Sequence, residues 1–119
     1  MHEDRPIGCM RLHALDAWVR SAAVLTDLET LKAVLYAGAA AGGASVLGEE
    51  FCVFPNGAVT GVLVLAQSHL TIHTWPEHRL ANVDLLSYGE VRGEVVLASI
   101  RDALDVERSR VTCLRRSFD

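Results

Sequence analysis

Eleven residues near the middle of the chain concentrate the side chains that could do chemistry. Residues 67–77 read QSHLTIHTWPE and hold a serine, two histidines, two threonines and a carboxylate. Their period-2 alternation predicts a strand over His69–Trp75, with apolar side chains on one face and polar or aromatic ones on the other. The first face carries Leu70 and Ile72, and the second carries His69, Thr71, His73 and Trp75.

The spacing of these side chains excludes two kinds of site. On a strand, Ser68 points away from His69 and from His73, so no serine–histidine hydrolase pair is indicated, and the GxSxG motif is absent. His69 and His73 share a face but lie about 13 Å apart, too far to share a metal ion. We therefore expect no metal site. Spacing alone favours a partly buried polar face of a sheet.

The cysteines indicate neither a disulfide framework nor a zinc site. There are three, Cys9, Cys52 and Cys113, and no CxxC motif. An odd number without metal-ligand spacing is typical of buried or idle thiols in a reducing cytoplasm.

The charge balance excludes two classes of partner. The 119 residues carry 11 basic and 15 acidic side chains, for a net charge of −4. We therefore expect neither a nucleic acid nor a membrane as partner. The N-terminal residues MHEDRP are polar and acidic, unlike a signal peptide, and the apolar stretches are too short to span a bilayer. We expect a cytoplasmic protein of one domain, residues 1–119, with 1–8 as a loose tail.

The first part of the chain predicts one strand and one helix. A mixed apolar pattern over residues 9–19 indicates a strand. Thr26 is the expected N-cap of a helix, and Glu29 three residues later completes a capping box. The helix should end near Gly42 and Gly43, which suit a C-cap. Its apolar face is a row of leucines at helical spacing, Leu28, Leu31 and Leu35.

The rest of the chain predicts four strands, a helix and a last strand. The strands are expected over residues 51–54, 59–66, 69–75 and 80–88, the helix over 91–104 and the last strand over 109–114. Residues 55–57, Pro-Asn-Gly, predict a turn. The order β-α-β-β-β-β-α-β predicts an α+β fold, a two-layer sandwich with two helices on one face of an antiparallel sheet.

Three segments carry a family resemblance. Residues 68–77, SHLTIHTWPE, resemble the signature of the bacterial and archaeal S-adenosylmethionine decarboxylases. Residues 54–61, FPNGAVTG, resemble the segment that leads to this signature in the family. Residues 81–89, ANVDLLSYG, resemble the family's segment A-x-x-D, two hydrophobic residues, x-C-G. With the length and helix placement, the likeness covers most of the chain.

The resemblance implies a pyruvoyl enzyme that is made as a proenzyme and cleaves itself. In the family, the serine hydroxyl attacks the preceding carbonyl carbon, and β-elimination then cuts the chain. Here the precursor is Ser68 and the broken bond is Gln67–Ser68. The implied cofactor is a pyruvoyl group derived from Ser68, which forms a Schiff base with the substrate amine and delocalises the carbanion left by decarboxylation. The implied reaction is S-adenosylmethionine decarboxylation for polyamine and spermidine biosynthesis, by a homodimer.

Further roles carry over from the resemblance. His73 matches the histidine of self-processing, and an imidazole can shuttle protons near neutral pH. Thr60 matches a hydroxyl that aligns the processing intermediate, and Phe54 matches an aromatic that faces adenine. For both, strand packing is the alternative. Glu77 either holds a substrate amine or caps the turn after Pro76.

Two positions depart from the family pattern. Gln67 replaces a glutamate, which removes a charge that can position a substrate cation. Tyr88 stands where the family has the catalytic cysteine that protonates the carbanion, so it either donates that proton or fills part of the pocket. A phenol, with a reference pKa of about 10 against about 8.5 for a thiol, is a weaker acid and bulkier. Two alternatives stay open: a pyruvoyl-dependent arginine or ornithine decarboxylase, and an unprocessed, non-catalytic paralogue that binds a ligand or dimerises with an active partner.

Overall fold

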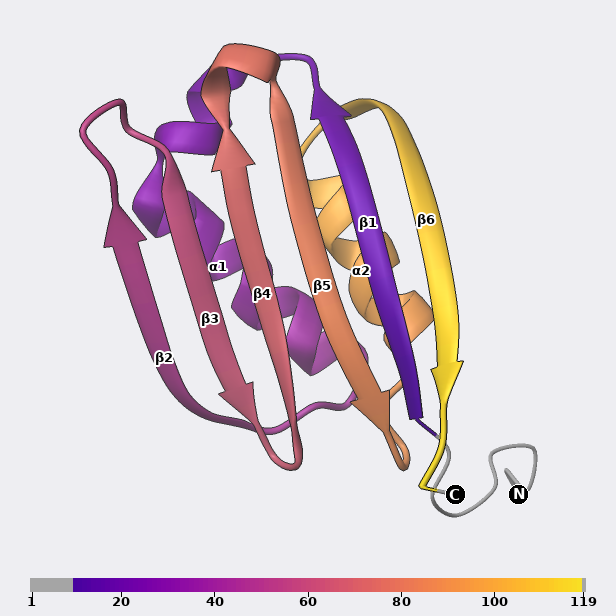
Figure 1. The fold of residues 1–119 in the computed structure, drawn as a ribbon. Coiled ribbons are helices and arrows are strands. Elements are labelled where there is room, and N and C mark those ends of the chain that lie inside the picture. The colour runs from indigo at the N-terminus through magenta and orange to yellow at the C-terminus, as the bar shows by residue number, and fades with distance from the viewer. Residues whose placement is uncertain (1–9, 119) are drawn as a thin grey trace.

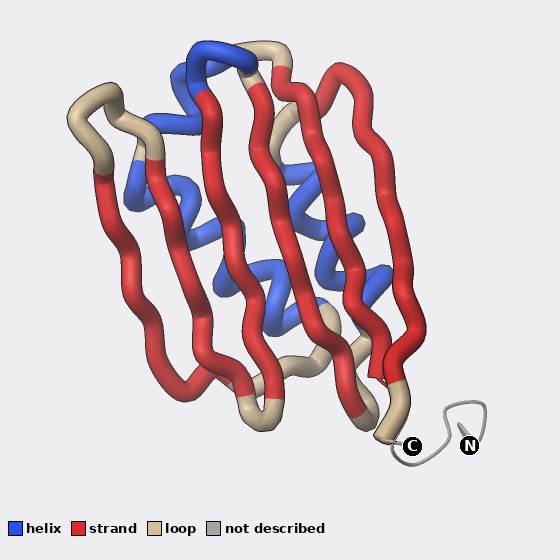
Figure 2. Tube along the Cα trace, viewed as in Figure 1, coloured by secondary structure: helices blue, strands red, loops and turns tan. Residues whose placement is uncertain are grey.

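The computed structural model describes residues 10–118, which form a six-stranded antiparallel sheet with two helices on one face (Figure 1). The predicted α+β class, the two layers and the order of strands and helices are confirmed. Figure 2 shows both helices behind the sheet, so no helix or strand among residues 10–118 covers the opposite face. The expected tail over residues 1–8, and Cys9, lie outside the described residues.

The order of the strands in space differs from their order in the chain. The strands are β1 (Met10–Val19), β2 (Val46–Val53), β3 (Val59–Leu65), β4 (Ser68–Trp75), β5 (Leu80–Tyr88) and β6 (Val106–Arg116). The helices are α1 (Leu28–Ala41) and α2 (Gly93–Ala103), with short 3₁₀ helices at Ala22–Thr26 and Pro76–His78. Across the sheet the order is β2-β3-β4-β5-β1-β6. The first strand of the chain thus lies between β5 and β6 (Figure 1).

The helices and the inner face of the sheet share one core. Along β4 the predicted alternation is confirmed: Leu70 and Ile72 are buried, whereas His73 is half-buried and Trp75 is exposed on the other face. The two helices approach closely, since a Cβ on Gly38 of α1 would lie 2.8 Å from Cγ1 of Ile100 of α2. The core also includes fully buried leucines from both layers, Leu15, Leu31, Leu35, Leu63 and Leu85.

The N-cap of α1 is Asp27, so the prediction of Thr26 with Glu29 in a capping box is wrong by one residue. Thr26 ends the preceding 3₁₀ helix instead, and its hydroxyl donates to the Ala23 carbonyl at 3.3 Å. Asp27 accepts hydrogen bonds from the amide of Thr30 at 3.2 Å and from its hydroxyl at 2.8 Å. These two bonds favour the charged carboxylate and lower the pKa of Asp27. The predicted end of α1 is confirmed, with Gly42 as C-cap.

Other boundaries also differ from the predictions. Helix α2 begins at Gly93, two residues later than expected, because the Arg92 amide donates to the Gly42 carbonyl at the end of α1. Strands β2 and β6 are longer than expected, because pairing with β3 and β1 extends each of them past a register shift near its start. The two described cysteines, Cys52 and Cys113, are exposed, so the buried alternative is wrong for both.

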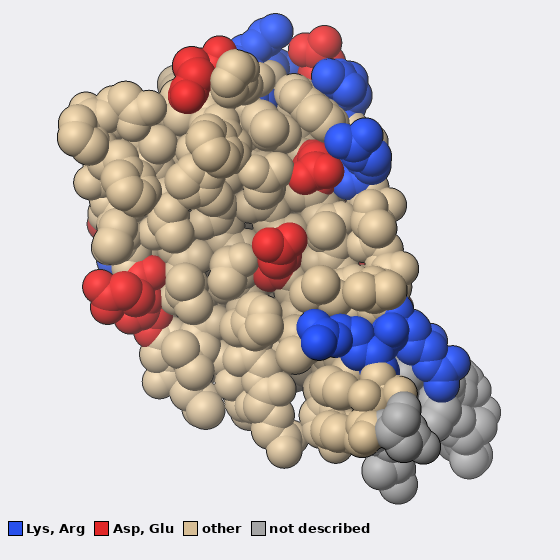
Figure 3. Space-filling model, in the orientation of Figure 1, with Lys and Arg blue, Asp and Glu red and all other residues tan. Residues whose placement is uncertain are grey.

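The face of the sheet that points away from the helices, called here the open face, is mostly uncharged. Figure 3 shows it as a largely tan surface with a few charged side chains. Hydrophobic side chains on this face remain exposed, among them Val64 of β3 and Leu114 of β6. No helix in the described part of the chain is long and apolar enough to cross a membrane.

Candidate active site

The local structure favours glycine at two positions of the FPNGAVTG segment. The Pro-Asn-Gly turn is confirmed: Phe54 donates to the Ala58 carbonyl and Gly57 to the Phe54 carbonyl, both at 2.8 Å. Gly57 takes a φ of 89°, a conformation that favours glycine. A Cβ on Gly61 would collide with the ring of Phe51, so this glycine lets an aromatic ring of β2 pack closely against β3.

This turn places Phe54 and Thr60 beside His73. Thr60 of β3 and His73 of β4 are direct partners in the register, and Thr60 Oγ1 lies 2.5 Å from His73 Nδ1. The ring centroids of Phe54 and His73 are 6.2 Å apart, and those of His73 and Trp75 are 4.3 Å apart, both edge to face. The structure therefore brings together three of the residues that the resemblance singles out. We call Phe54, Thr60, His73 and Trp75 the histidine cluster.

Ser68 lies at the opposite end of β4 from the histidine cluster. It follows a turn in which Gln67 has a φ of 61°, a left-handed backbone that residues with a Cβ seldom adopt. The Ser68 hydroxyl donates to the Leu86 carbonyl of β5. His73 lies five residue steps along the strand from Ser68, which corresponds to about 17 Å. Within one chain, the structure does not bring these two side chains together.

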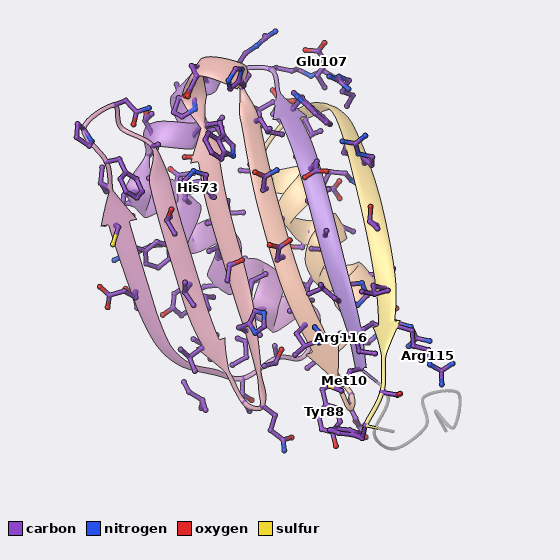
Figure 4. All side chains as sticks on the ribbon, in the orientation of Figure 1. Met10, His73, Tyr88, Glu107, Arg115 and Arg116 are labelled. Atoms are coloured by element: carbon purple, nitrogen blue, oxygen red, sulfur yellow. The ribbon has the colours of Figure 1, made fainter. Side chains whose placement is uncertain are left out.

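Tyr88 lies at the Ser68 end of the sheet. It ends β5, two residues after the Leu86 carbonyl that accepts the serine hydroxyl. Its ring meets that of Phe118 edge to face at 5.9 Å. Figure 4 shows His73 and Tyr88 at different ends of the sheet. The predicted site residues thus form two groups, the histidine cluster and the group of Gln67, Ser68 and Tyr88.

Glu77 and Lys32, the only lysine of the sequence, lie on different parts of the fold. Glu77 is exposed in the 3₁₀ helix Pro76–His78, directly after the strand end that carries the histidine cluster. Lys32 lies on α1 and pairs with Glu49 at 3.1 Å, on the helix side of the sheet. The lysine amine is thus on the other side of the sheet from His73. Among residues 10–118, no group of three or more His, Cys, Asp or Glu side chains could hold a metal ion.

The sequence pattern missed a set of polar side chains beside the histidine cluster. The Trp75 indole N–H donates to Asn82 Oδ1 at 2.6 Å, and Asn82 Nδ2 donates to Asp16 Oδ1 at 2.8 Å. Asp16 Oδ2 lies 3.5 Å from Nε of Arg110. The period-2 pattern signals that each of these side chains is on the open face. It carries no signal for the pairing of strands that makes them neighbours.

Comparisons with known proteins agree on one family. The family model described as S-adenosylmethionine decarboxylase matches residues 11–117. The chain is 35% identical over 96 residues to the S-adenosylmethionine decarboxylase proenzyme of Thermodesulfovibrio yellowstonii, covering 80% of this chain and 71% of that protein. It is 33% identical over 105 residues to the proenzyme of the same name from Methanococcus maripaludis, covering 87% and 86%. The crystal structure of the adenosylmethionine decarboxylase from Aquifex aeolicus VF5 matches this fold with a TM-score of 0.86 at 23% identity, over 96% of this chain and 95% of that one.

Proposed function

Because the chain belongs to the S-adenosylmethionine decarboxylase family, we propose that it is a pyruvoyl-dependent S-adenosylmethionine decarboxylase. It is made as a proenzyme of one domain, cleaves itself between Gln67 and Ser68, and serves polyamine biosynthesis in the cytoplasm. The two relatives from Thermodesulfovibrio yellowstonii and Methanococcus maripaludis both carry the name S-adenosylmethionine decarboxylase proenzyme. The comparisons therefore give no support to an arginine or ornithine decarboxylase or to an unprocessed paralogue.

The observation that carries the self-cleavage proposal is the backbone at the Gln67–Ser68 bond. The left-handed conformation of Gln67 costs about 1–2 kcal/mol for a residue with a Cβ. Such strain concentrates at functional sites. Breaking the bond after Gln67 releases this strain, while β3 and β4 hold both new ends in place.

The proposed cleavage needs only groups of the chain and one water molecule. Ser68 Oγ bonds to the Gln67 carbonyl carbon as the C–N bond breaks, which gives an ester and a free amine. Loss of the Ser68 α-proton then breaks the Cβ–Oγ bond and frees the Gln67 carboxylate. Hydrolysis of the remaining enamine, through its imine, releases ammonia and leaves a pyruvoyl group at the start of residues 68–119. That group supplies the electron sink for decarboxylation.

The distance between Ser68 and His73 supports a homodimer. An imidazole about 17 Å away along the same strand cannot move protons at Ser68. If two open faces stack about a twofold axis perpendicular to the strands, each β4 lies antiparallel over the other. The partner's His73 and Thr60 then lie over the end of β4 that carries the Gln67–Ser68 bond. The exposed hydrophobic side chains of the open face, such as Val64 and Leu114, support such a contact.

Three further residues are assigned roles: two in binding the substrate and one in protonating the carbanion that decarboxylation leaves. Phe54 is 43% exposed beside His73, which suits a ring that stacks on adenine. The exposed carboxylate of Glu77 follows the histidine cluster and suits the cationic substrate. Tyr88, at the Ser68 end, holds the position of the family's acid and is assigned the proton donation that follows loss of carbon dioxide.

An intact mass of the purified, denatured protein tests the proposed function. We expect two fragments, residues 1–67 and residues 68–119. The second should be lighter than its sequence by the mass of one ammonia, because a pyruvoyl group replaces the N-terminal serine. Carbon dioxide release from S-adenosylmethionine by this cleaved protein should follow. A single uncut chain would contradict the proposal, and release only from arginine or ornithine would reassign the substrate.

Tyr88→Cys tests the assignment of the proton donor. A thiol is more acidic than a phenol, and the smaller side chain opens the site, so we expect S-adenosylmethionine turnover to rise about tenfold. The measurement is the kcat of carbon dioxide release. Tyr36→Cys, a change on the exposed side of α1, serves as the matched control and should leave kcat unchanged. An unchanged kcat in Tyr88→Cys would mean that the proton comes from another group.

A further inference from the structure

One straight row of directly paired residues crosses five strands on the open face. In register, Thr60 of β3 pairs with His73 of β4, His73 with Asn82 of β5, Asn82 with Asp16 of β1, and Asp16 with Arg110 of β6. We call these five residues the polar row. The polar row connects the proposed processing histidine to the far edge of the sheet.

Trp75 packs against His73, and its own orientation depends on a hydrogen bond. It stands two residues after His73 on the same face, with the two rings at an interplanar angle of 68°. The Trp75 side chain is 40% exposed, so packing alone leaves it several rotamers. Its single polar atom, the indole N–H, donates to Asn82 Oδ1 at 2.6 Å. This bond selects the rotamer that packs against His73.

Asp16 decides which way the Asn82 amide points. An amide presents an oxygen acceptor at one end and N–H donors at the other, whereas a carboxylate only accepts. Asn82 therefore turns its NH₂ group toward Asp16, with Nδ2 at 2.8 Å from Oδ1. Its oxygen is then left facing Trp75, as the indole N–H requires. With the amide reversed, both bonds would be lost.

Arg110 plays a smaller part. It lies 3.5 Å from Asp16, but its side chain is 69% exposed, and such surface ion pairs contribute about 0–1 kcal/mol. The Asp16 side chain is 30% exposed. The carboxylate of Asp16, held between β5 and β6, is thus the residue that orients the rest of the polar row.

We propose that Asp16 and Asn82 are positioning residues for His73, an inference that rests on the proposed role of His73 in self-cleavage. They hold the Trp75 indole, which packs on one side of the His73 ring, while Thr60 engages Nδ1 on the other. A ring held at two points cannot rotate about its Cβ–Cγ bond. The second ring nitrogen, Nε2, is thereby held in one orientation, from which it is proposed to exchange protons at the partner's Ser68.

The rate of self-cleavage in Asp16→Leu tests this inference. Leucine keeps a side chain of similar size but cannot accept from Asn82, so we expect cleavage of newly made chain to slow about tenfold. Asp16→Asn keeps an oxygen acceptor and should restore the rate to within about threefold of the parent. Asp102→Leu, the same change on the exposed side of α2, is the control and should cleave at the parent rate. Equal rates in Asp16→Leu and the parent would overturn the inference.

A second readout separates this inference from the proposed function. In the uncleavable Ser68→Ala chain, nuclear magnetic resonance follows hydrogen exchange of the Trp75 indole N–H and the shifts of the two His73 ring nitrogens. Adding Asp16→Leu should speed the exchange about tenfold and move both nitrogen shifts, whereas Asp102→Leu should change neither. If the parent chain does not cleave, the proposed function fails and this readout alone judges the positioning role. His73 shifts that stay unchanged in Asp16→Leu would overturn it.

Discussion

Ser68→Ala should leave the chain in one piece and without decarboxylase activity. Alanine has no hydroxyl to attack the Gln67 carbonyl, so neither the ester nor the pyruvoyl group forms. We expect the intact mass of one uncut chain and no carbon dioxide release above background. The fold should persist, because the lost side chain makes one hydrogen bond, to the Leu86 carbonyl at the edge of the turn.

A matched serine controls for this change. Ser45 is exposed in the loop before β2, and its hydroxyl has no part in the proposed chemistry. Ser45→Ala should cleave and turn over like the parent. Decarboxylation by uncut Ser68→Ala protein would contradict the pyruvoyl mechanism, and cleavage of Ser68→Ala at another bond would contradict the assigned site.

His73→Ala should slow self-cleavage by about 10²- to 10⁴-fold, the usual contribution of a general acid–base group. The geometry makes a sharper prediction for mixtures of chains. His73→Ala chains retain Ser68, and Ser68→Ala chains retain His73. When the two are co-expressed, mixed dimers place an intact histidine over an intact serine. The His73→Ala chains should then be cleaved, and the Ser68→Ala chains should stay whole.

The double variant Ser68→Ala/His73→Ala is the control for this complementation. Co-expressed with His73→Ala, it supplies the same dimer surface without a histidine, so cleavage should remain slow. A His73→Ala chain that stays uncut beside Ser68→Ala, while both form dimers, would contradict the transfer of His73 between subunits. It would then follow that another group handles the protons at Ser68.

The local pattern of the sequence predicted much of this fold because the alternation of β4 and the leucine row of α1 are short-range signals. The N-cap was missed because Thr26 and Asp27 are both good caps. Burial of Leu25 in the preceding 3₁₀ helix decides between them. The start of β2 was missed because Glu49 and Glu50 are atypical of strands, and pairing with β3 overrides that preference.

The candidate site also has a part that local sequence patterns predict and a part that depends on strand pairing. The motifs named Ser68, His73 and Thr60, but a motif does not tell that Thr60 and His73 touch while Ser68 stands at the other end of the strand. The contact between Asp16 and Asn82 could not be predicted from the sequence, since 66 positions separate them in the chain. Their contact depends on β1 inserting beside β5, which no local pattern encodes.

The insertion of β1 between β5 and β6 also ties the timing of the proposed cleavage to folding. Cleavage after Gln67 would give one fragment with β1, α1, β2 and β3 and another with β4, β5, α2 and β6. In the first fragment, β1 has both of its partner strands on the other chain. The uncut chain folds as a unimolecular process, whereas the cut protein, once unfolded, has to reassemble in a second-order reaction that dilution slows. The proposed cleavage would therefore be a one-way step: it would have to follow folding, and each unfolding of the cut protein would carry a kinetic penalty that the uncut chain does not have.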